Sequence, residues 1–255
     1  METATKAMRP EIDKSGFTQM GCTAIRDFLS RSEVTSLSET LQKTLPSTVN
    51  NNTYSSDYAK AYLSGIDLAL KNSSLQAWVT NSPISKLADH LLSTDTVFIR
   101  DQFFEKSPEL LGTPLHQDAY SLPYYCREVA TIWIPLTEVN FSPLVFKLKT
   151  HLERVPYPRP NTYDWTEVEE ATTYGLQPGD VSIHHGWTVH GSRVDASCQA
   201  QEEKVCRKAW AVMYASAKEY ASSTSHPHDK WMKTQDNEYL EIVQRTRKEI
   251  LERKY

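Results

Sequence analysis

The sequence predicts one α+β domain, mainly β, whose core is an antiparallel sandwich or jelly roll flanked by helices. Three observations predict this class: helical patterns open and close the chain, several strand-like segments lie between them, and turn signals separate those segments. The chain has 255 residues, with no internal repeat and no low-complexity linker. We therefore expect a single domain over 1–255, with its core in about 16–220.

Three segments have the apolar periodicity and the end signals of helices. In the first, Ser30 and Glu33 have the spacing of a capping box. In the second, Ser82 stands at the N-cap position and Pro83 at the first helical position, where proline is favoured. The expected helices cover residues 27–41, 83–92 and 236–254.

Five segments rich in β-branched and aromatic residues, with partial alternation of polar and apolar positions, are expected to be strands. They cover residues 96–104, 128–139, 144–148, 181–185 and 208–215. The turn sequence 177–180, with proline and glycine at its centre, leads into the fourth of them. Short strands separated by turns favour an antiparallel arrangement.

Composition excludes several functional classes. The formal net charge is -4, the pI is near 6.1 and no basic run occurs, so a nucleic-acid partner is not expected. No stretch approaches the roughly 18 apolar residues that span a bilayer, and the polar residues 1–13 show no secretory signal. The four cysteines form no CxxC pair. We expect a cytoplasmic protein with a small-molecule partner and no membrane partner, and the sequence leaves its oligomeric state open.

The first chemical signal is the pair His116 and Asp118. Residues i and i+2 of a strand point to the same side, so one strand would present both side chains to one metal ion. Imidazole and carboxylate ligands suit iron(II), and a second histidine on the same face would leave three neighbouring coordination positions open. Alone the pair is a weak signal, because a surface histidine beside an aspartate has the same spacing.

The second signal is a run of histidines after the turn. His184 and His185 lie on the predicted strand, and we expect them to pack or to form hydrogen bonds. His190 follows a short loop and is favoured as the functional histidine, because it precedes Gly191 and Ser192. A glycine at that point allows the backbone to approach a ligand closely.

The third signal is Arg207, which begins an otherwise apolar strand. An arginine in that position needs an anionic partner. A guanidinium pairs bidentately with a carboxylate, such as the distal carboxylate of 2-oxoglutarate. The alternative is a surface arginine at the end of a strand.

Taken together, these residues resemble the phytanoyl-CoA dioxygenase (PhyH) family of iron(II)/2-oxoglutarate oxygenases. The resemblance rests on the order of several short motifs over about 16–215, since no single motif is specific. In chain order the matching stretches are Gly-Phe at 16–17, Phe-Leu-Ser-x-x-Glu-Val at 28–34, Asp-Gln-x-x-x-Lys at 101–106, His-Gln-Asp at 116–118, Trp133, Pro-Gly-Asp at 178–180, His-Gly-Ser at 190–192, and Arg207.

The resemblance implies a double-stranded β-helix, a cupin-like jelly roll with iron at its open mouth. It implies that His116, Asp118 and His190 are the catalytic metal ligands, with 2-oxoglutarate and O2 as co-substrates and ascorbate as the reductant in vitro. The expected activity is a dioxygenase that oxidises a small molecule and releases succinate and CO2. The presence of Asp118 excludes the halogenase variant, in which a small residue replaces this carboxylate.

The resemblance also implies the co-substrate site. Arg207 would bind the C5 carboxylate of 2-oxoglutarate with the help of Ser192, and Gln102 and Trp133 would line the pocket.

Two stretches depart from the family pattern. Residues 140–151 lack the glycines that the family has after the tryptophan strand, so this loop is expected to be built differently. The segment between His190 and Arg207 is longer than usual, which makes Arg193 a competitor for the role of Arg207. Arg193 is disfavoured, because no strand pattern follows it.

Aromatic and basic residues near the predicted ligands are the candidates for substrate contact. They are Tyr120, Tyr124, Arg127, Trp187 and Arg193. A substrate carboxylate would be held by Arg127, Arg193 or Lys147. The chain shows no cluster of basic residues for the phosphates of coenzyme A, so we expect a natural-product or amino-acid-like metabolite. Hydroxylation is the default outcome, and desaturation or oxidative cyclisation is chemically adjacent.

Two other classes of protein stay open at this point. A metal-dependent enzyme on the same scaffold that does not use 2-oxoglutarate would keep the three ligands but would not need Arg207. A jelly-roll binding protein without catalysis is the second class, and the intact ligand set argues against it.

Overall fold

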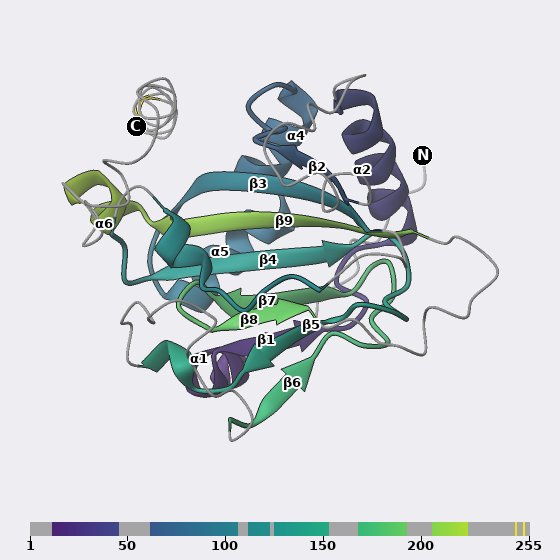
Figure 1. Ribbon diagram of the computed structural model, residues 1–255. Coiled ribbons are helices and arrows are strands. Elements are labelled where there is room, and N and C mark those ends of the chain that lie inside the picture. Colours follow the sequence, from purple (N-terminus) through teal and green to yellow (C-terminus); the bar gives the residue numbers. More distant parts are fainter. Residues whose placement is uncertain are drawn as a thin grey trace.

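The strands of the computed structural model form two antiparallel sheets (Figure 1). The structure describes residues 12–45, 62–106, 112–122, 125–152, 168–192 and 206–223, with single positions at 248 and 252. The strands are β1 (Cys22–Ile25), β2 (Tyr62–Ile66), β3 (Thr96–Lys106), β4 (Val129–Pro135), β5 (Leu144–Lys147), β6 (Glu170–Thr172), β7 (Val181–His185), β8 (His190–Ser192) and β9 (Arg207–Ser216).

The order of the strands is that of an open jelly roll. The larger sheet runs β1-β7-β4-β9-β3-β2, and the smaller sheet runs β6-β5-β8. The sheets face each other, since Phe146 of β5 lies against His184 of β7 with ring centroids 5.1 Å apart. The predicted jelly-roll class is therefore confirmed, and the described strands form two facing sheets without closing into a barrel.

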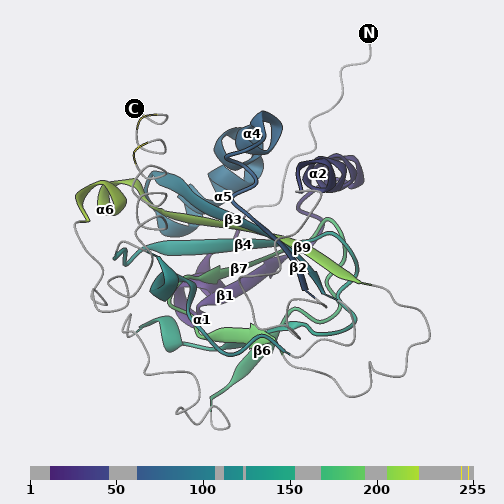
Figure 2. The same ribbon diagram turned by 45° about the horizontal axis from the view of Figure 1, so that its top comes forward.

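Helices cover the outer face of the larger sheet, as Figures 1 and 2 show for α2, α4 and α5. The helices are α1 (Ser15–Met20), α2 (Arg31–Thr44), α4 (Ser73–Asn81), α5 (Pro83–Leu92) and α6 (Ala217–Ser222). The predicted capping box of Ser30 and Glu33 starts α2. The second predicted helix has the expected bounds, with Ser82 as N-cap and Pro83 in the first position.

Strand alternation separates the larger sheet into a helix-facing side and a side that faces the smaller sheet. Ile132 and Ile183 belong to the core beneath the helices. Their chain neighbours Thr131 and His184 line a cavity on the opposite side. Thr131 and His184 are thereby brought to the space between the two sheets.

Several short elements were not predicted, each of nine residues or fewer: α1, α4, α6, β1, β2, β6 and β8. Segments this short offer too few positions for apolar periodicity to be recognised. The strand expected over 128–139 is shorter in the structure, since β4 ends at Pro135. The helix expected over 236–254 lies outside the described residues, except for two helical positions, 248 and 252. Among the described helices, none combines the length and apolar character that crossing a membrane requires.

Candidate metal centre and its cavity

Three side chains that the sequence predicts as metal ligands meet between the two sheets. Ligand atoms of His116, Asp118 and His190 all lie within 4.8 Å of one another. Asp118 Oδ1 is 3.5 Å from His116 Nε2 and 3.6 Å from His190 Nε2. Neighbouring ligands of an octahedral ion lie roughly 3 Å apart, because each bond is about 2.1 Å long. Small side-chain movements would therefore place all three on one ion.

Both histidines direct Nε2 toward Asp118, because a backbone carbonyl engages the other ring nitrogen. His116 Nδ1 donates to Pro114 O at 2.9 Å, and His190 Nδ1 donates to Thr188 O at 3.0 Å. Hydrogen bonds of this kind fix the tautomer and the ring orientation of metal-binding histidines. Two imidazoles and one carboxylate on a single face suit iron(II) and leave three neighbouring positions for other ligands.

The segment that carries His116 and Asp118 is not the strand that was expected. His116 forms a single antiparallel bridge with His190, with backbone N–H to O distances of 2.8 and 2.9 Å. Asp118 is the first residue of a short 3₁₀ helix, η2 (Asp118–Ser121). The two side chains still share one side, because Gln117 between them is extended, with φ -123° and ψ 130°.

The second oxygen of Asp118 is held by two donors from the larger sheet. Thr131 Oγ1 donates to Oδ2 at 2.6 Å, and His184 Nε2 donates to the same oxygen at 2.9 Å. Oδ1 is left facing the two ligand histidines, so Asp118 is set to bind an ion through one oxygen. The expectation that His184 forms hydrogen bonds is confirmed, and its partner is the candidate ligand itself. His185 packs against Phe17, with ring centroids 5.7 Å apart, and its Nδ1 accepts from Trp187 N at 3.1 Å.

The surroundings of the centre favour the metal-binding protonation states of Asp118 and His190, but not that of His116. Burial raises the pKa of Asp118, but the surrounding histidines outweigh it and hold that pKa well below its usual value. Burial and the charge of His184 hold the pKa of His190 well below its usual value. Burial lowers the pKa of His116, but the hydrogen bond and charge of Asp118 outweigh it, so this pKa is raised. A histidine must be deprotonated to bind a metal. The metal affinity should therefore decrease as the pH is lowered and His116 takes up a proton.

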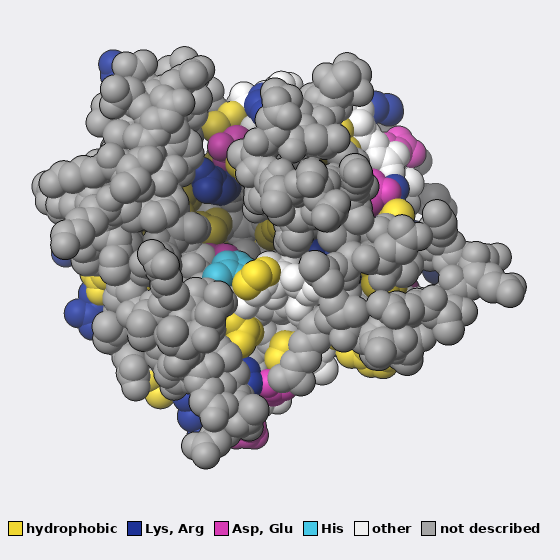
Figure 3. Space-filling model, viewed as in Figure 1, with side chains coloured by type: hydrophobic (Ala, Val, Ile, Leu, Met, Phe, Trp, Pro, Cys, Tyr) yellow, Lys and Arg dark blue, Asp and Glu magenta, His cyan; other side chains and the backbone are white. Residues whose placement is uncertain are grey.

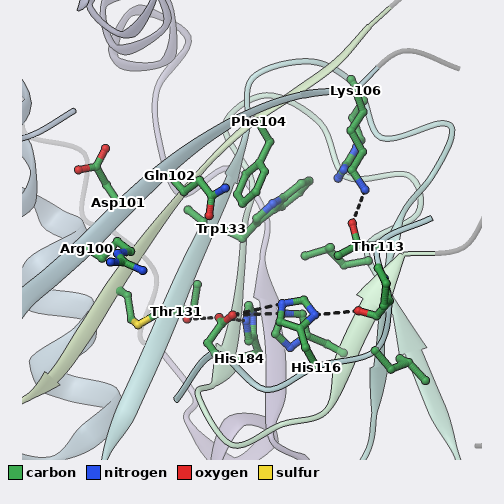
Figure 4. Close-up of a pocket in the computed structure, with 18 residues that line it drawn as sticks. Arg100, Asp101, Gln102, Phe104, Lys106, Thr113, His116, Thr131, Trp133 and His184 are labelled. Atoms are coloured by element: carbon green, nitrogen blue, oxygen red, sulfur yellow. Dashed lines mark hydrogen bonds and ion pairs between the residues drawn. The ribbon is translucent and has the colours of Figure 1, made fainter. Parts of the chain in front are cut away.

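A cavity of about 360 Å³ opens beside the three ligands. Figure 3 shows a hollow with a histidine at its floor and with apolar and basic side chains around it, and Figure 4 shows its lining in detail. The predicted co-substrate residues Gln102, Trp133 and Arg207 all line it. Arg207 is 2% exposed, and its guanidinium lies 5.3 Å from the ring centroid of Trp133. The volume suits a small ligand.

Lys106 lies at the same end of the cavity and was not predicted as a site residue. It is paired with Arg207 across β3 and β9, and its Nζ donates to Ser192 Oγ at 2.7 Å and to Thr113 Oγ1. Burial and then the charge of Arg207 lower the pKa of Lys106 to about 7. Two buried cations side by side favour a bound anion. The signal in the sequence is the last residue of the 101–106 motif, which alternation places on the same side as Gln102.

Among the residues predicted to contact substrate, those that the structure describes with their side chains do not line the cavity. Trp187 is fully buried, its Nε1 donates to Cys126 O at 2.9 Å, and it is not among the described residues that line the cavity, so its contact with substrate stays a prediction. Arg127 is exposed and is absent from the described lining. Lys147 is buried in an ion pair with Glu170. The described residues do not include Tyr124 and Arg193, nor the side chain of Tyr120.

Gly191 allows two chain segments to approach each other closely. From the sequence, this glycine was expected to allow close approach of the backbone to a ligand. A Cβ atom built on Gly191 would lie 2.6 Å from Thr113 O and 3.1 Å from Pro114 O. Pro114 O is also the acceptor that orients the His116 ring. Glycine at this position therefore sets the separation between β8, which carries His190, and the 113–116 segment, which carries His116.

Gly191→Ala is expected to push the 113–116 segment away from His190 and to weaken metal binding. Overpacking of this kind should also lower the free energy of unfolding by about 1–3 kcal/mol. Calorimetric titration with Mn(II) and thermal denaturation measure the two effects. Gly16→Ala is the matched control, because a Cβ there meets nothing nearer than 3.3 Å. Equal Mn(II) affinity in the two variants would show that the segment adjusts without moving His116.

Comparison with known proteins relates the greater part of this chain to one family. Residues 17–200 match the family model described as Phytanoyl-CoA dioxygenase (PhyH). No curated protein matches the chain.

Solved structures show the same fold. The non-heme alpha-ketoglutarate-dependent epimerase SnoN from nogalamycin biosynthesis is 21% identical, with a TM-score of 0.65 over 80% of this chain and 81% of that chain. The carbocyclase SnoK from nogalamycin biosynthesis is 20% identical, with a TM-score of 0.65 over 88% and 89%. EvdO2 from Micromonospora carbonacea var. aurantiaca, complexed with 2-oxoglutarate, is 18% identical, with a TM-score of 0.62 over 86% and 95%.

Proposed function

The chain belongs to the phytanoyl-CoA dioxygenase (PhyH) family, and we propose that it is a non-heme iron(II)/2-oxoglutarate-dependent dioxygenase that oxidises a small molecule. One observation carries the proposal: the His116, Asp118 and His190 donors open onto a cavity whose wall holds the buried cations Lys106 and Arg207. A dicarboxylate that chelates a metal at one end needs a cationic site for its other end. The products released with the oxidised substrate are succinate and CO2.

The chain's own residues bind and orient the reactants. Bound iron(II) supplies the activation of O2 that is coupled to the decarboxylation of 2-oxoglutarate. Arg207 and Lys106 would hold the C5 carboxylate, and Ser192 keeps the Lys106 ammonium in place through its hydroxyl. Trp133 packs under the Arg207 guanidinium and closes that end of the cavity. Buried walls keep water from the charges and so strengthen these contacts.

A natural-product-type metabolite is the substrate class that the comparisons favour. SnoN and SnoK both come from nogalamycin biosynthesis, where one is an epimerase and the other a carbocyclase. The cavity of about 360 Å³ matches a small molecule in size. Hydroxylation is the expected outcome for this chain, with desaturation or oxidative cyclisation as variants of the same oxidation.

The pKa of Lys106 predicts how co-substrate binding depends on pH. The protonated fraction of Lys106 falls as the pH rises through about 7, and only the ammonium attracts a carboxylate. We expect the affinity of the Mn(II)-loaded protein for 2-oxoglutarate to fall between about pH 7 and 9, by at most about tenfold per pH unit. Titration calorimetry of the wild type and of Lys106→Met measures it. The variant should bind more weakly and lose the slope, and an unchanged slope would assign the titration to another group.

Succinate formation tests the proposed function directly. Purified protein is incubated with iron(II), ascorbate and 2-oxoglutarate, and the wild type is compared with His116→Ala and with the exposed-histidine control His90→Ala. We expect slow turnover in the wild type and in His90→Ala, and none in His116→Ala, because the ligand set is then incomplete. If the wild type forms no succinate and shows no metal-dependent binding of 2-oxoglutarate, the proposal fails. A metal-dependent enzyme without this co-substrate, or a binding protein, would then replace it.

A further inference from the structure

Strand β3 contains a β-bulge beside the cavity. Its ladder with β9 pairs Phe98 with Tyr214 and then Arg100 with Met213, so Ile99 is an extra residue on β3. A bulge of this kind places two successive side chains on the same side of a sheet and often re-aims a residue next to an active site.

The bulge turns Arg100 into the cavity. Phe98 and Tyr214, before the bulge, lie in the core beneath the helices. Regular alternation would send Arg100 to that same apolar core, two positions after Phe98. Ile99 instead packs on the cavity side, in a cluster with Met213, and Arg100 lines the cavity directly after it.

Arg100 and Lys106 lie on opposite sides of the cavity, with Gln102 between them along β3 (Figure 4). Six residues of extended strand span roughly 20 Å between the two Cα atoms. From this span and the placement in Figure 4, we infer that a C5 acid bound to the Lys106–Arg207 pair does not also contact Arg100. The Arg100 end is therefore separate from the end that the proposed co-substrate would occupy.

We propose that Arg100 binds a carboxylate of the substrate, so that the enzyme oxidises an organic acid with an apolar body. This inference rests on the proposed function and names the substrate class for that same cavity. A guanidinium presents two parallel donors that match a carboxylate and fix its orientation. The apolar side chains that line the same cavity would contact the body of the acid: Phe104, Leu115, Leu144 and Met213.

In the described part of the chain, Arg100 forms an ion pair with Asp67. Its Oδ1 lies 3.7 Å from Arg100 Nε, which is longer than a hydrogen bond. Arg100 and Asp67 have side chains that are 25% and 22% exposed, so neither charge is fully hydrated. Asp67 lies beside the Nε edge of Arg100, and the Arg100 side chain also lines the cavity.

Matched pairs of acids and amides test the inference. The probes are 3-phenylpropanoate with 3-phenylpropanamide, and hexanoate with hexanamide. Binding is measured by titration calorimetry to Mn(II)-loaded protein with 2-oxoglutarate saturating, so that the other cations are already occupied. The proteins are the wild type, Arg100→Gln, Arg100→Lys and the surface control Arg31→Gln.

We expect each acid to bind the wild type roughly ten- to a hundredfold more tightly than its amide, the range for a hydrogen-bonded charge. Arg31→Gln should keep this preference, Arg100→Gln should reduce it to about threefold or less, and Arg100→Lys should restore part of it. If the wild type binds both acids no better than their amides, or Arg100→Gln keeps the full preference, the inference is overturned. Succinate formation by the wild type, measured separately, shows whether the proposed function stands in that case.

Discussion

Replacing Arg207 with methionine is expected to weaken the binding of 2-oxoglutarate by about 30-fold to several thousand-fold. Arg207 is buried on the cavity wall, with Trp133 against its guanidinium. Removing one partner of a buried, hydrogen-bonded charge pair costs about 2–5 kcal/mol, and about 1.4 kcal/mol corresponds to tenfold in affinity. Methionine keeps most of the apolar volume, so the loss would report the charge.

The measurement is a titration of 2-oxoglutarate into Mn(II)-loaded protein, with Arg31→Met as the control because Arg31 is exposed at the start of α2. Part of the loss will be offset, since the charge of Arg207 helps to lower the pKa of Lys106, and its removal leaves Lys106 more fully protonated. The double variant Lys106→Met with Arg207→Met should then lose more affinity than Arg207→Met alone. Affinity within about threefold of the wild type in Arg207→Met would place the C5 carboxylate elsewhere.

The second large effect is expected at His184, which contacts the candidate metal site without being one of its ligands. His184→Phe keeps an aromatic ring of similar size but removes the donor to Asp118 Oδ2. Groups that orient a metal ligand typically contribute about 10- to 100-fold to metal affinity. We expect a loss in this range for Mn(II) and a changed Co(II) absorption spectrum, because Thr131 is then the one remaining donor described to Asp118 Oδ2 and the carboxylate is held less firmly.

His184→Gln and Thr131→Val separate positioning from simple packing. His184→Gln retains a donor and should recover part of the metal affinity, whereas Thr131→Val removes the other donor to Asp118 Oδ2. The two losses should not add in His184→Phe with Thr131→Val, because both donors act on one oxygen. Wild-type Mn(II) affinity and an unchanged Co(II) spectrum in His184→Phe would contradict a positioning role.

The elements that could be predicted from the sequence are those whose signals are local. Ser82 and Pro83 predicted the start of α5, and the expected bounds of α5 and of β7 agree with the structure. The candidate ligands and Arg207 could be named because each stands in a short motif and because the motifs follow one another in a characteristic order. The structure then brings the ligands within 4.8 Å of one another.

Side-chain direction could not be predicted where it depends on partners far away in the chain. Trp187 was expected to contact substrate, and the structure shows it buried, with its Nε1 donating to Cys126 O. Lys106 gains its place because β3 and β9 pair it with Arg207, a residue about a hundred positions later in the chain.

By itself the sequence determined the jelly-roll class, the family and the residue types that can hold a metal and a carboxylate. Only the tertiary structure decided which polar groups share the cavity. The ladder between β3 and β9 places the bulge at Ile99 that turns Arg100 inward. The antiparallel neighbours β4 and β7 aim Thr131 and His184 at one oxygen of Asp118. The physical reason is that a slip of one residue in strand pairing reverses the direction of every side chain, and this register is set by packing between distant segments.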